Sequence, residues 1–127
     1  MRTRTLLFLP VGLLAIAALC SCGVKEGGAC TGEGYRCEDR STVLECRDGH
    51  WLALPCSGPQ GCAVSGGGVT CDISLNQEGD GCPTALEGTG FCRDTPPSLF
   101  ACRNLTLVKI QNCSSCTVGA GNIVCNP

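Results

Sequence analysis

The residues of this chain with the most obvious chemical potential are cysteines, and one pair forms the motif Cys113-Ser-Ser-Cys116. A C-x-x-C motif can be a redox dithiol or half of a zinc site. Zinc needs four ligands, and the sequence holds no second C-x-x-C motif or histidine pair at a suitable spacing. A redox pair normally accompanies a βαβ pattern, which is missing around Cys113. We therefore expect structural disulfides, with no metal and no cofactor.

Other catalytic arrangements lack their partners. His50 is the only histidine and sits beside a predicted hairpin turn, where we expect it to be exposed. A serine–histidine–acid triad needs a scaffold that brings its members together, and the chain has no G-x-S-x-G motif. Phosphate loops of the Walker type and the register of a calcium loop are also missing. We expect no catalytic residues and no enzymatic activity.

Twelve of the 14 cysteines form two successive sets of six. The intervals between neighbours hold 6, 8, 9, 5 and 8 residues in the first set and 9, 9, 10, 2 and 8 in the second. Six cysteines allow 15 pairings, and the spacing does not choose among them. The sets predict two small modules that depend on disulfides in place of a large core. Their members are Cys30, Cys37, Cys46, Cys56, Cys62 and Cys71, then Cys82, Cys92, Cys102, Cys113, Cys116 and Cys125.

Composition predicts a small, disulfide-rich, all-β fold of short hairpins with little helix. The chain has 18 glycines, seven prolines and few aromatic residues, which favours tight turns. Asp48-Gly49 is a strong signal for a two-residue hairpin turn and would place Cys46 opposite Trp51 and Glu45 opposite Leu52. A second hairpin, with Gly66 near its tip, would place Cys62 across from Cys71, where a cross-strand bond is geometrically plausible.

The two modules align beyond their cysteines. Residues 43–47, VLECR, match residues 99–103, LFACR, and residues 69–71, VTC, match residues 123–125, IVC. We therefore expect a duplicated fold, with module 1 at residues 30–72 and module 2 at residues 82–127. Residues 73–81 are polar and rich in turn formers, which predicts a linker between them.

The N-terminus predicts export. Arg2 and Arg4 precede an apolar run over residues 6–19, which is shorter than the roughly 20 residues of a membrane-spanning helix. The following residues 19–23, LCSCG, resemble a bacterial lipobox, with a leucine at −3 and a small residue at −1. The resemblance implies a signal peptide at 1–21, lipidation and palmitoylation at Cys22, and a tether at 22–29. Cleavage after residues 15–17, which would release a secreted protein, is the alternative.

The lipobox implies a location in the cell envelope. Gly23 at the position after Cys22 is similar to the signal for the outer membrane of Gram-negative cells. Without Arg2 and Arg4 the chain has seven basic and 11 acidic residues, a net charge of −4. With no basic patch and no interleaved aromatic residues, we expect no nucleic-acid partner. The whole chain resembles the cysteine-rich lipoproteins of Gram-negative bacteria.

Binding is the function these features favour. Trp51 could stack on a sugar or anchor a protein, or it could instead cover a disulfide as a substitute for core. Residues 43–51, VLECRDGHW, followed by Cys56, resemble the central hairpin of peritrophin-type chitin-binding modules, which implies a glycan ligand. A disulfide-scaffold protease inhibitor is a further alternative, with Arg47, Arg93 or Lys109 as the residue that enters the protease. We expect a non-catalytic binding or structural role at the cell surface, with a protein or glycan ligand and a membrane contact through the acyl chains on Cys22.

Overall fold

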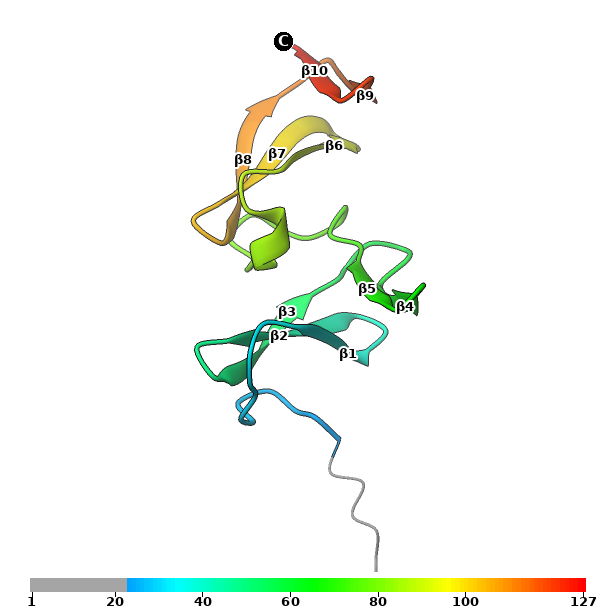
Figure 1. Cartoon of the computed structure of the whole chain (residues 1–127). Coiled ribbons are helices and arrows are strands. Elements are labelled where there is room, and N and C mark those ends of the chain that lie inside the picture. The colour runs from blue at the N-terminus through cyan, green and yellow to red at the C-terminus, as the bar shows by residue number, and fades with distance from the viewer. Residues whose placement is uncertain (1–22) are drawn as a thin grey trace, which may run out of the picture.

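The computed structural model describes residues 23–127, which form ten short strands and one 3₁₀ turn (Figure 1). The predicted signal peptide and Cys22 lie outside these residues. Module 1 contains β1 (Tyr35–Asp39), β2 (Thr42–Arg47), β3 (His50–Pro55), β4 (Cys62–Ser65) and β5 (Gly68–Cys71). Module 2 contains the 3₁₀ turn η1 (Thr84–Leu86), β6 (Gly90–Asp94), β7 (Pro97–Arg103), β8 (Thr106–Asn112), β9 (Ser115–Gly119) and β10 (Asn122–Asn126). The predicted small, disulfide-rich, all-β fold is confirmed.

Both modules have the same topology. Each contains a three-stranded antiparallel sheet, β1-β2-β3 or β6-β7-β8, followed by a separate two-stranded hairpin, β4-β5 or β9-β10. The predicted register of the central hairpin is confirmed, since Cys46 pairs with Trp51 and Glu45 with Leu52. The first strand of each sheet was not predicted, because β1 lacks the apolar alternation that identifies a half-buried strand.

The hairpins close over two-residue turns that demand a left-handed backbone. Asp48 and Gly49 have φ values of 52° and 80°, and Asn104 and Leu105 have 51° and 59°. Positive φ at both central residues is typical of type I′ turns, which match the twist of the strands they join. These turns set the register and so determine which side chains reach the inner face of each sheet.

The disulfides of the two modules follow one pattern. In each module the first cysteine bonds the third, the second bonds the fifth and the fourth bonds the sixth. The bonds are Cys30–Cys46, Cys37–Cys62 and Cys56–Cys71 in module 1, and Cys82–Cys102, Cys92–Cys116 and Cys113–Cys125 in module 2. The shared pattern supports the duplication expected from the sequence.

Cys62 and Cys71 illustrate why pairing cannot be deduced from register alone. They lie opposite each other on β4 and β5, as expected, but they are not bonded to each other. Cys62 reaches back to β1, and Cys71 reaches Cys56, which follows β3. The two bonds therefore fasten the hairpin to the three-stranded sheet, which a bond within the hairpin would not do.

The segment before each module pairs with the third strand of the sheet. Ala29 forms a bridge to His50, and Gly81 forms the equivalent bridge to Thr106. The amide of Gly27 donates to the carbonyl of Trp51 at 2.8 Å. The predicted tether before module 1 and the predicted linker before module 2 are thus hydrogen-bonded to strands over part of their length.

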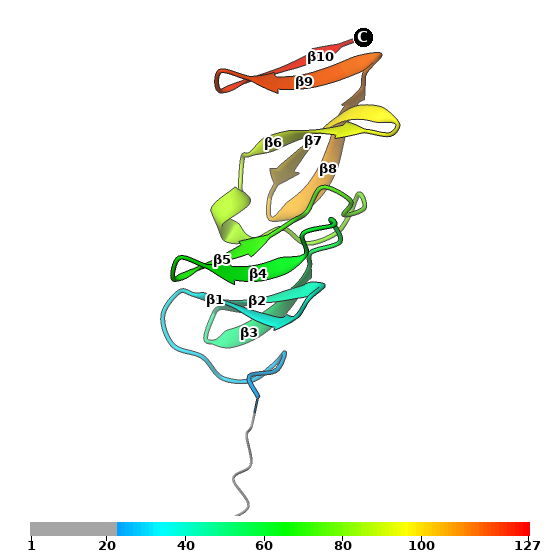
Figure 2. The same ribbon diagram turned by 90° about the vertical axis from the view of Figure 1, so that its right-hand side faces the viewer.

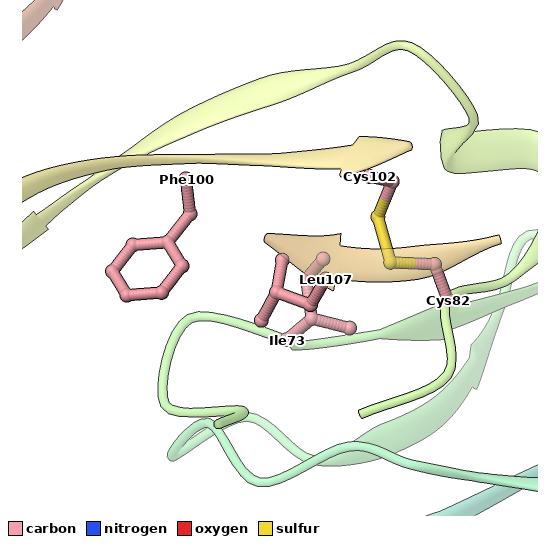
Figure 3. Close-up of a cluster of buried hydrophobic side chains, with 5 residues drawn as sticks. All are labelled: Ile73, Cys82, Phe100, Cys102 and Leu107. Atoms are coloured by element: carbon pink, nitrogen blue, oxygen red, sulfur yellow. A yellow bond between two sulfur atoms is a disulfide. The ribbon is translucent and has the colours of Figure 1, made fainter. Parts of the chain in front are cut away.

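Each module has a small apolar cluster built around disulfides. In module 1 the cluster is formed by Val43, Leu54, Cys56 and Cys62. In module 2 it is formed by Cys82, Phe100, Cys102 and Leu107, together with Ile73 from the segment between the modules (Figure 3). Ile73 therefore ties the predicted linker into the core of module 2.

The two modules are stacked end to end. Module 1 lies beside the N-terminal segment, and β9-β10 lies at the opposite end with the C-terminus (Figures 1 and 2). Within residues 23–127 there is no helix with the length and apolar composition that a membrane crossing requires.

Gly61 provides a test of how closely the β4-β5 hairpin is held against the sheet. A Cβ atom at Gly61 would lie 2.1 Å from the carbonyl oxygen of Arg40, and φ is +61°. We expect Gly61→Ala to lower the free energy of unfolding by more than about 1 kcal/mol, because both the conformation and the contact oppose a side chain. Gly34→Ala is the control, since nothing lies within 4 Å of its Cβ position. Equal denaturation midpoints for the two variants would show that this contact is not as close as the structure places it.

Candidate functional site

Both cysteines of the C-x-x-C motif are bonded in the structure. Cys113 bonds Cys125 and Cys116 bonds Cys92, so the C-x-x-C motif is not itself a disulfide. The two residues belong to different bonds of the shared framework and hold β9-β10 against the sheet. No group of three or more potential metal ligands gathers among residues 23–127.

His50 lies on the surface, as its position beside the turn predicted. Its Nδ1 atom is 3.3 Å from the carbonyl oxygen of Asp48, within the same hairpin. The side chain is exposed at the start of β3. The structure therefore gives His50 a local contact in the turn.

Trp51 is half-buried on β3, opposite Cys46 of the Cys30–Cys46 disulfide. The guanidinium carbon of Arg36 lies 5.7 Å from the centre of its ring. The equivalent residue of module 2 is the one that pairs with Cys102. Both hairpins close over two residues, so the residue opposite Cys102 is Leu107.

The contact between the modules is built around the carboxylate of Glu45, which sequence reasoning did not identify. Glu45 is 4% exposed. Its Oε1 atom accepts hydrogen bonds from the hydroxyl of Tyr35 and from the amide of Thr84, both at 3.1 Å. Its Oε2 atom pairs with Arg47. A residue of module 1 thereby holds the start of η1 in module 2.

Arg47 and Tyr35 extend this network across the junction. The Nη2 atom of Arg47 donates to the carbonyl of Cys82 at 3.2 Å, and the hydroxyl of Tyr35 accepts from the amide of Ala85 at 3.1 Å. Burial of the Tyr35 hydroxyl, together with the nearby Glu45 carboxylate, raises the pKa of Tyr35. Tyr35 therefore stays protonated and able to donate at neutral pH. Glu45, Arg47 and Tyr35 have these partners in module 2 only when both modules are in place, whereas the buried Nε atom of Arg47 has no partner among the described residues.

A second set of bonds fastens the segment between the modules from both sides. Asn76 is 1% exposed, and its side chain donates to the carbonyl of Pro55 at 2.7 Å and accepts from the amide of Ser57 at 2.8 Å. Arg93 of module 2 donates to the carbonyls of Ser74, at 3.2 Å, and Asn76. Its guanidinium carbon also lies 4.2 Å from the centre of the Phe100 ring. The segment is thus held by module 1 through Asn76 and by module 2 through Arg93.

Beside this junction runs an apolar depression, which we call the junction groove. It consists of two adjoining cavities of about 280 and 290 Å³ that share Cys71 and Leu86. Its walls come from β5, the η1 region and β6, which lie near one another in Figure 2. The principal lining side chains are Tyr35, Val69, Cys71, Pro83 and Leu86 in one cavity, and Cys71, Ile73, Leu86 and Phe91 in the other.

One side of the groove is the unpaired edge of a strand. β5 pairs with β4 alone, and its other edge faces η1 (Figure 2). Since β4-β5 closes over a two-residue turn, the backbone groups of Val69 and Cys71 point away from β4. The groove therefore combines apolar cavities with hydrogen-bonding groups along an extended chain.

The groove is negatively charged at its Asp72 end. Partial burial raises the pKa of Asp72, but hydrogen bonds from Ser74 and from the amide of Gln60 outweigh this, and the pKa lies below its ordinary value. The carboxylate is therefore ionised at neutral pH. A ligand in the groove would gain from a basic group at this end.

The junction network can be tested by removing its central carboxylate. We expect Glu45→Ala to lower the free energy of unfolding by about 2 kcal/mol, less than for a fully buried pair because the Arg47 side chain is 24% exposed. Glu38→Ala is the control, since Glu38 is exposed and should change stability by no more than about 0.5 kcal/mol. Chemical denaturation of both variants measures the difference. If they were equally stable, the Glu45 network would not hold the modules together.

No protein-family model matches the chain, and the searches found no similar curated protein and no similar solved structure. The function proposed below therefore depends on the residues and geometry of the chain itself.

Proposed function

We propose that this chain is a lipid-anchored protein of the bacterial cell envelope that acts by binding and not by catalysis. The membrane anchor is supported by residues 19–23, LCSCG, with Cys22 as the acylated residue. The observation that carries the binding role is the junction groove, an apolar surface on a scaffold held by six disulfides. A rigid surface loses little conformational freedom when it binds a partner.

The groove favours an extended polypeptide as the partner. Peptides often bind by adding a strand to an exposed sheet edge, where main-chain hydrogen bonds give affinity and pockets for alternate side chains give specificity. The edge of β5 and the two adjoining cavities supply both features. Asp72 adds a preference for a basic residue at one end.

The glycan alternative would use Trp51. An aromatic ring can stack on a sugar, but Arg36 already lies over the Trp51 ring. The Trp51→Ala variant distinguishes a glycan ligand from a peptide ligand. If the wild-type protein is retained on insoluble polysaccharide and the variant is not, the ligand is a glycan.

Protease inhibition finds less support in the geometry. Arg47 is paired with Glu45, and Arg93 donates to the carbonyls of Ser74 and Asn76, so both guanidiniums are already engaged. Lys109 is exposed, but it lies within β8 and not on a protruding loop. A residue that enters a protease pocket must be free to leave its own surface.

The proposed lipid anchor predicts the N-terminal residue and the mass of the mature protein. We expect the intact mass of protein extracted from membranes to correspond to a chain starting at Cys22 plus lipid. We expect Cys22→Ala to give an unacylated protein that no longer sediments with membranes. A wild-type mass without lipid would contradict the anchor and would favour a secreted protein.

The groove predicts that its apolar lining is required for peptide binding. Leu86 lines both cavities and is half-buried. Peptides selected from a displayed library on the wild-type protein should bind Leu86→Arg at least tenfold more weakly, because each 1.4 kcal/mol lost is a factor of ten and a buried leucine contributes about 1.5–3 kcal/mol. Leu75→Arg is the matched control, since Leu75 is 56% exposed and does not line the groove.

Amide hydrogen exchange, measured with and without the selected peptide, provides a second test of the binding site. If the peptide adds to the edge of β5, exchange at Val69 and Cys71 should slow when it binds. Equal binding to the Leu86→Arg and Leu75→Arg variants, with no protection on β5, would place the binding site elsewhere.

A further inference from the structure

Trp51 occupies a position that is buried in one module and partly open in the other. Its counterpart, Leu107, is 1% exposed and packs with Ile73 and the Cys82–Cys102 disulfide (Figure 3). Ile73 comes from the segment that precedes module 2. Trp51 is half-buried and belongs to neither buried cluster of the described residues. In module 2, Ile73 from the segment before the module covers Leu107. In module 1, the equivalent side of Trp51 is partly open.

The material that precedes module 1 is the lipid anchor. Ile73 stands nine residues before Cys82, and the residue nine before Cys30 is Ser21, next to Cys22. If Cys22 is acylated, Ser21 is removed with the signal peptide and the lipid is attached at the next residue, which corresponds to Ser74 beside Ile73. The repeat thus points to the membrane as the neighbour of Trp51.

Hydrogen bonds hold the chain leaving the anchor against Trp51. The amide of Gly27 donates to the carbonyl of Trp51 at 2.8 Å, and the amide of Trp51 donates to the carbonyl of Gly28 at 2.9 Å. Val24 lines a cavity of about 470 Å³ together with Trp51 and Arg36. The Trp51 surface, meaning Val24, Arg36 and Trp51, is therefore fixed to the first residues after the anchor.

Covalent reach limits how far this surface can stand from the bilayer. Two residues of extended chain span about 7 Å, which is the greatest distance between Val24 and Cys22 along the backbone. The polar layer on each side of a bilayer is about 5–8 Å thick. An acylated Cys22 therefore keeps Val24 at the depth of the lipid headgroups, and Trp51 lines the same cavity as Val24.

The chemistry of the surface suits that depth. Tryptophan concentrates at membrane–water interfaces because its ring is amphipathic. The guanidinium of Arg36 beside the ring, and the exposed Lys25, can meet lipid phosphates. Glu26 and Glu33 are also exposed nearby, so the surface has no excess of positive charge. The ring and the anchor, and not general attraction to anionic lipid, would provide the contact.

We propose that the Trp51 surface rests among the phospholipid headgroups and sets the orientation of the whole stack. This inference depends on the lipid anchor proposed above. Module 1 is then seated on the membrane, and β9-β10 points away from it (Figure 2). The junction groove, between the modules, stays accessible to a partner.

The chain offers a direct probe because Trp51 is its only tryptophan. We would reconstitute the acylated full-length protein into phosphatidylethanolamine–phosphatidylglycerol vesicles containing lipids brominated close to the headgroup. Bromine quenches tryptophan on contact, so we expect a loss of emission relative to unbrominated vesicles, with a shift to shorter wavelength. Lipids brominated near the end of the acyl chain should quench less.

A reporter at the far end provides the control. Val118 on β9 is 66% exposed, and Trp51→Phe combined with Val118→Trp moves the single tryptophan there. Its emission should be the same in brominated and unbrominated vesicles. Unquenched Trp51 in a protein that is acylated and bound to vesicles would overturn this inference and leave the anchor intact. Unacylated protein that does not bind vesicles would overturn the anchor, and this inference with it.

The other occupants of the Trp51 surface give distinct results. A soluble chitin oligosaccharide that shifts Trp51 emission in detergent, with no quenching in vesicles, would assign the surface to glycan. Dimers of the acylated protein that dissociate on Trp51→Ala would assign it to a second copy. Either result contradicts the membrane contact.

Discussion

The disulfide framework is the constraint on which the rest of this structure depends. Each module has fewer than 50 residues between its outer cysteines, and its apolar cluster contains only a few side chains. A core of that size cannot by itself offset the conformational entropy of folding. Three bonds per module, worth typically about 2–4 kcal/mol each, reduce the freedom of the unfolded chain. They also fasten each two-stranded hairpin to its sheet, which places β5 at the wall of the junction groove.

The two modules share their framework and differ where they touch. Glu45 of module 1 corresponds to Ala101 of module 2, Tyr35 to Gly90, and Glu38 to Arg93. In module 1 Glu45 and Tyr35 accept hydrogen bonds from the amides of η1, and in module 2 Arg93 donates to the segment after β5. The two copies of the scaffold therefore carry different residues at the junction, and each set contacts the chain that joins the modules. The result is a single stack, in which the N-terminal end of module 1, the junction groove and the distal hairpin follow one another along one axis (Figure 2).

Much of the fold could be predicted because it follows from local chemistry. Asp48-Gly49 determines a turn, the turn determines the register, and the cysteine spacing reveals the repeat. The junction could not be predicted in this way. Glu45 lies within an apolar strand and looks like an outward-facing residue until the second module covers it, and Asn76 looks like an ordinary loop residue. A comparison of the modules offered one signal, because Glu45 stands where the other module has alanine.

The two modules are held by one disulfide pattern, with equivalent cysteines paired in each. Peptide mapping of the unreduced protein by mass spectrometry tests it most directly. We predict six linked pairs, each joining the first cysteine to the third, the second to the fifth or the fourth to the sixth of one module. A bond between Cys62 and Cys71, or any bond joining one module to the other, would contradict this disulfide pattern.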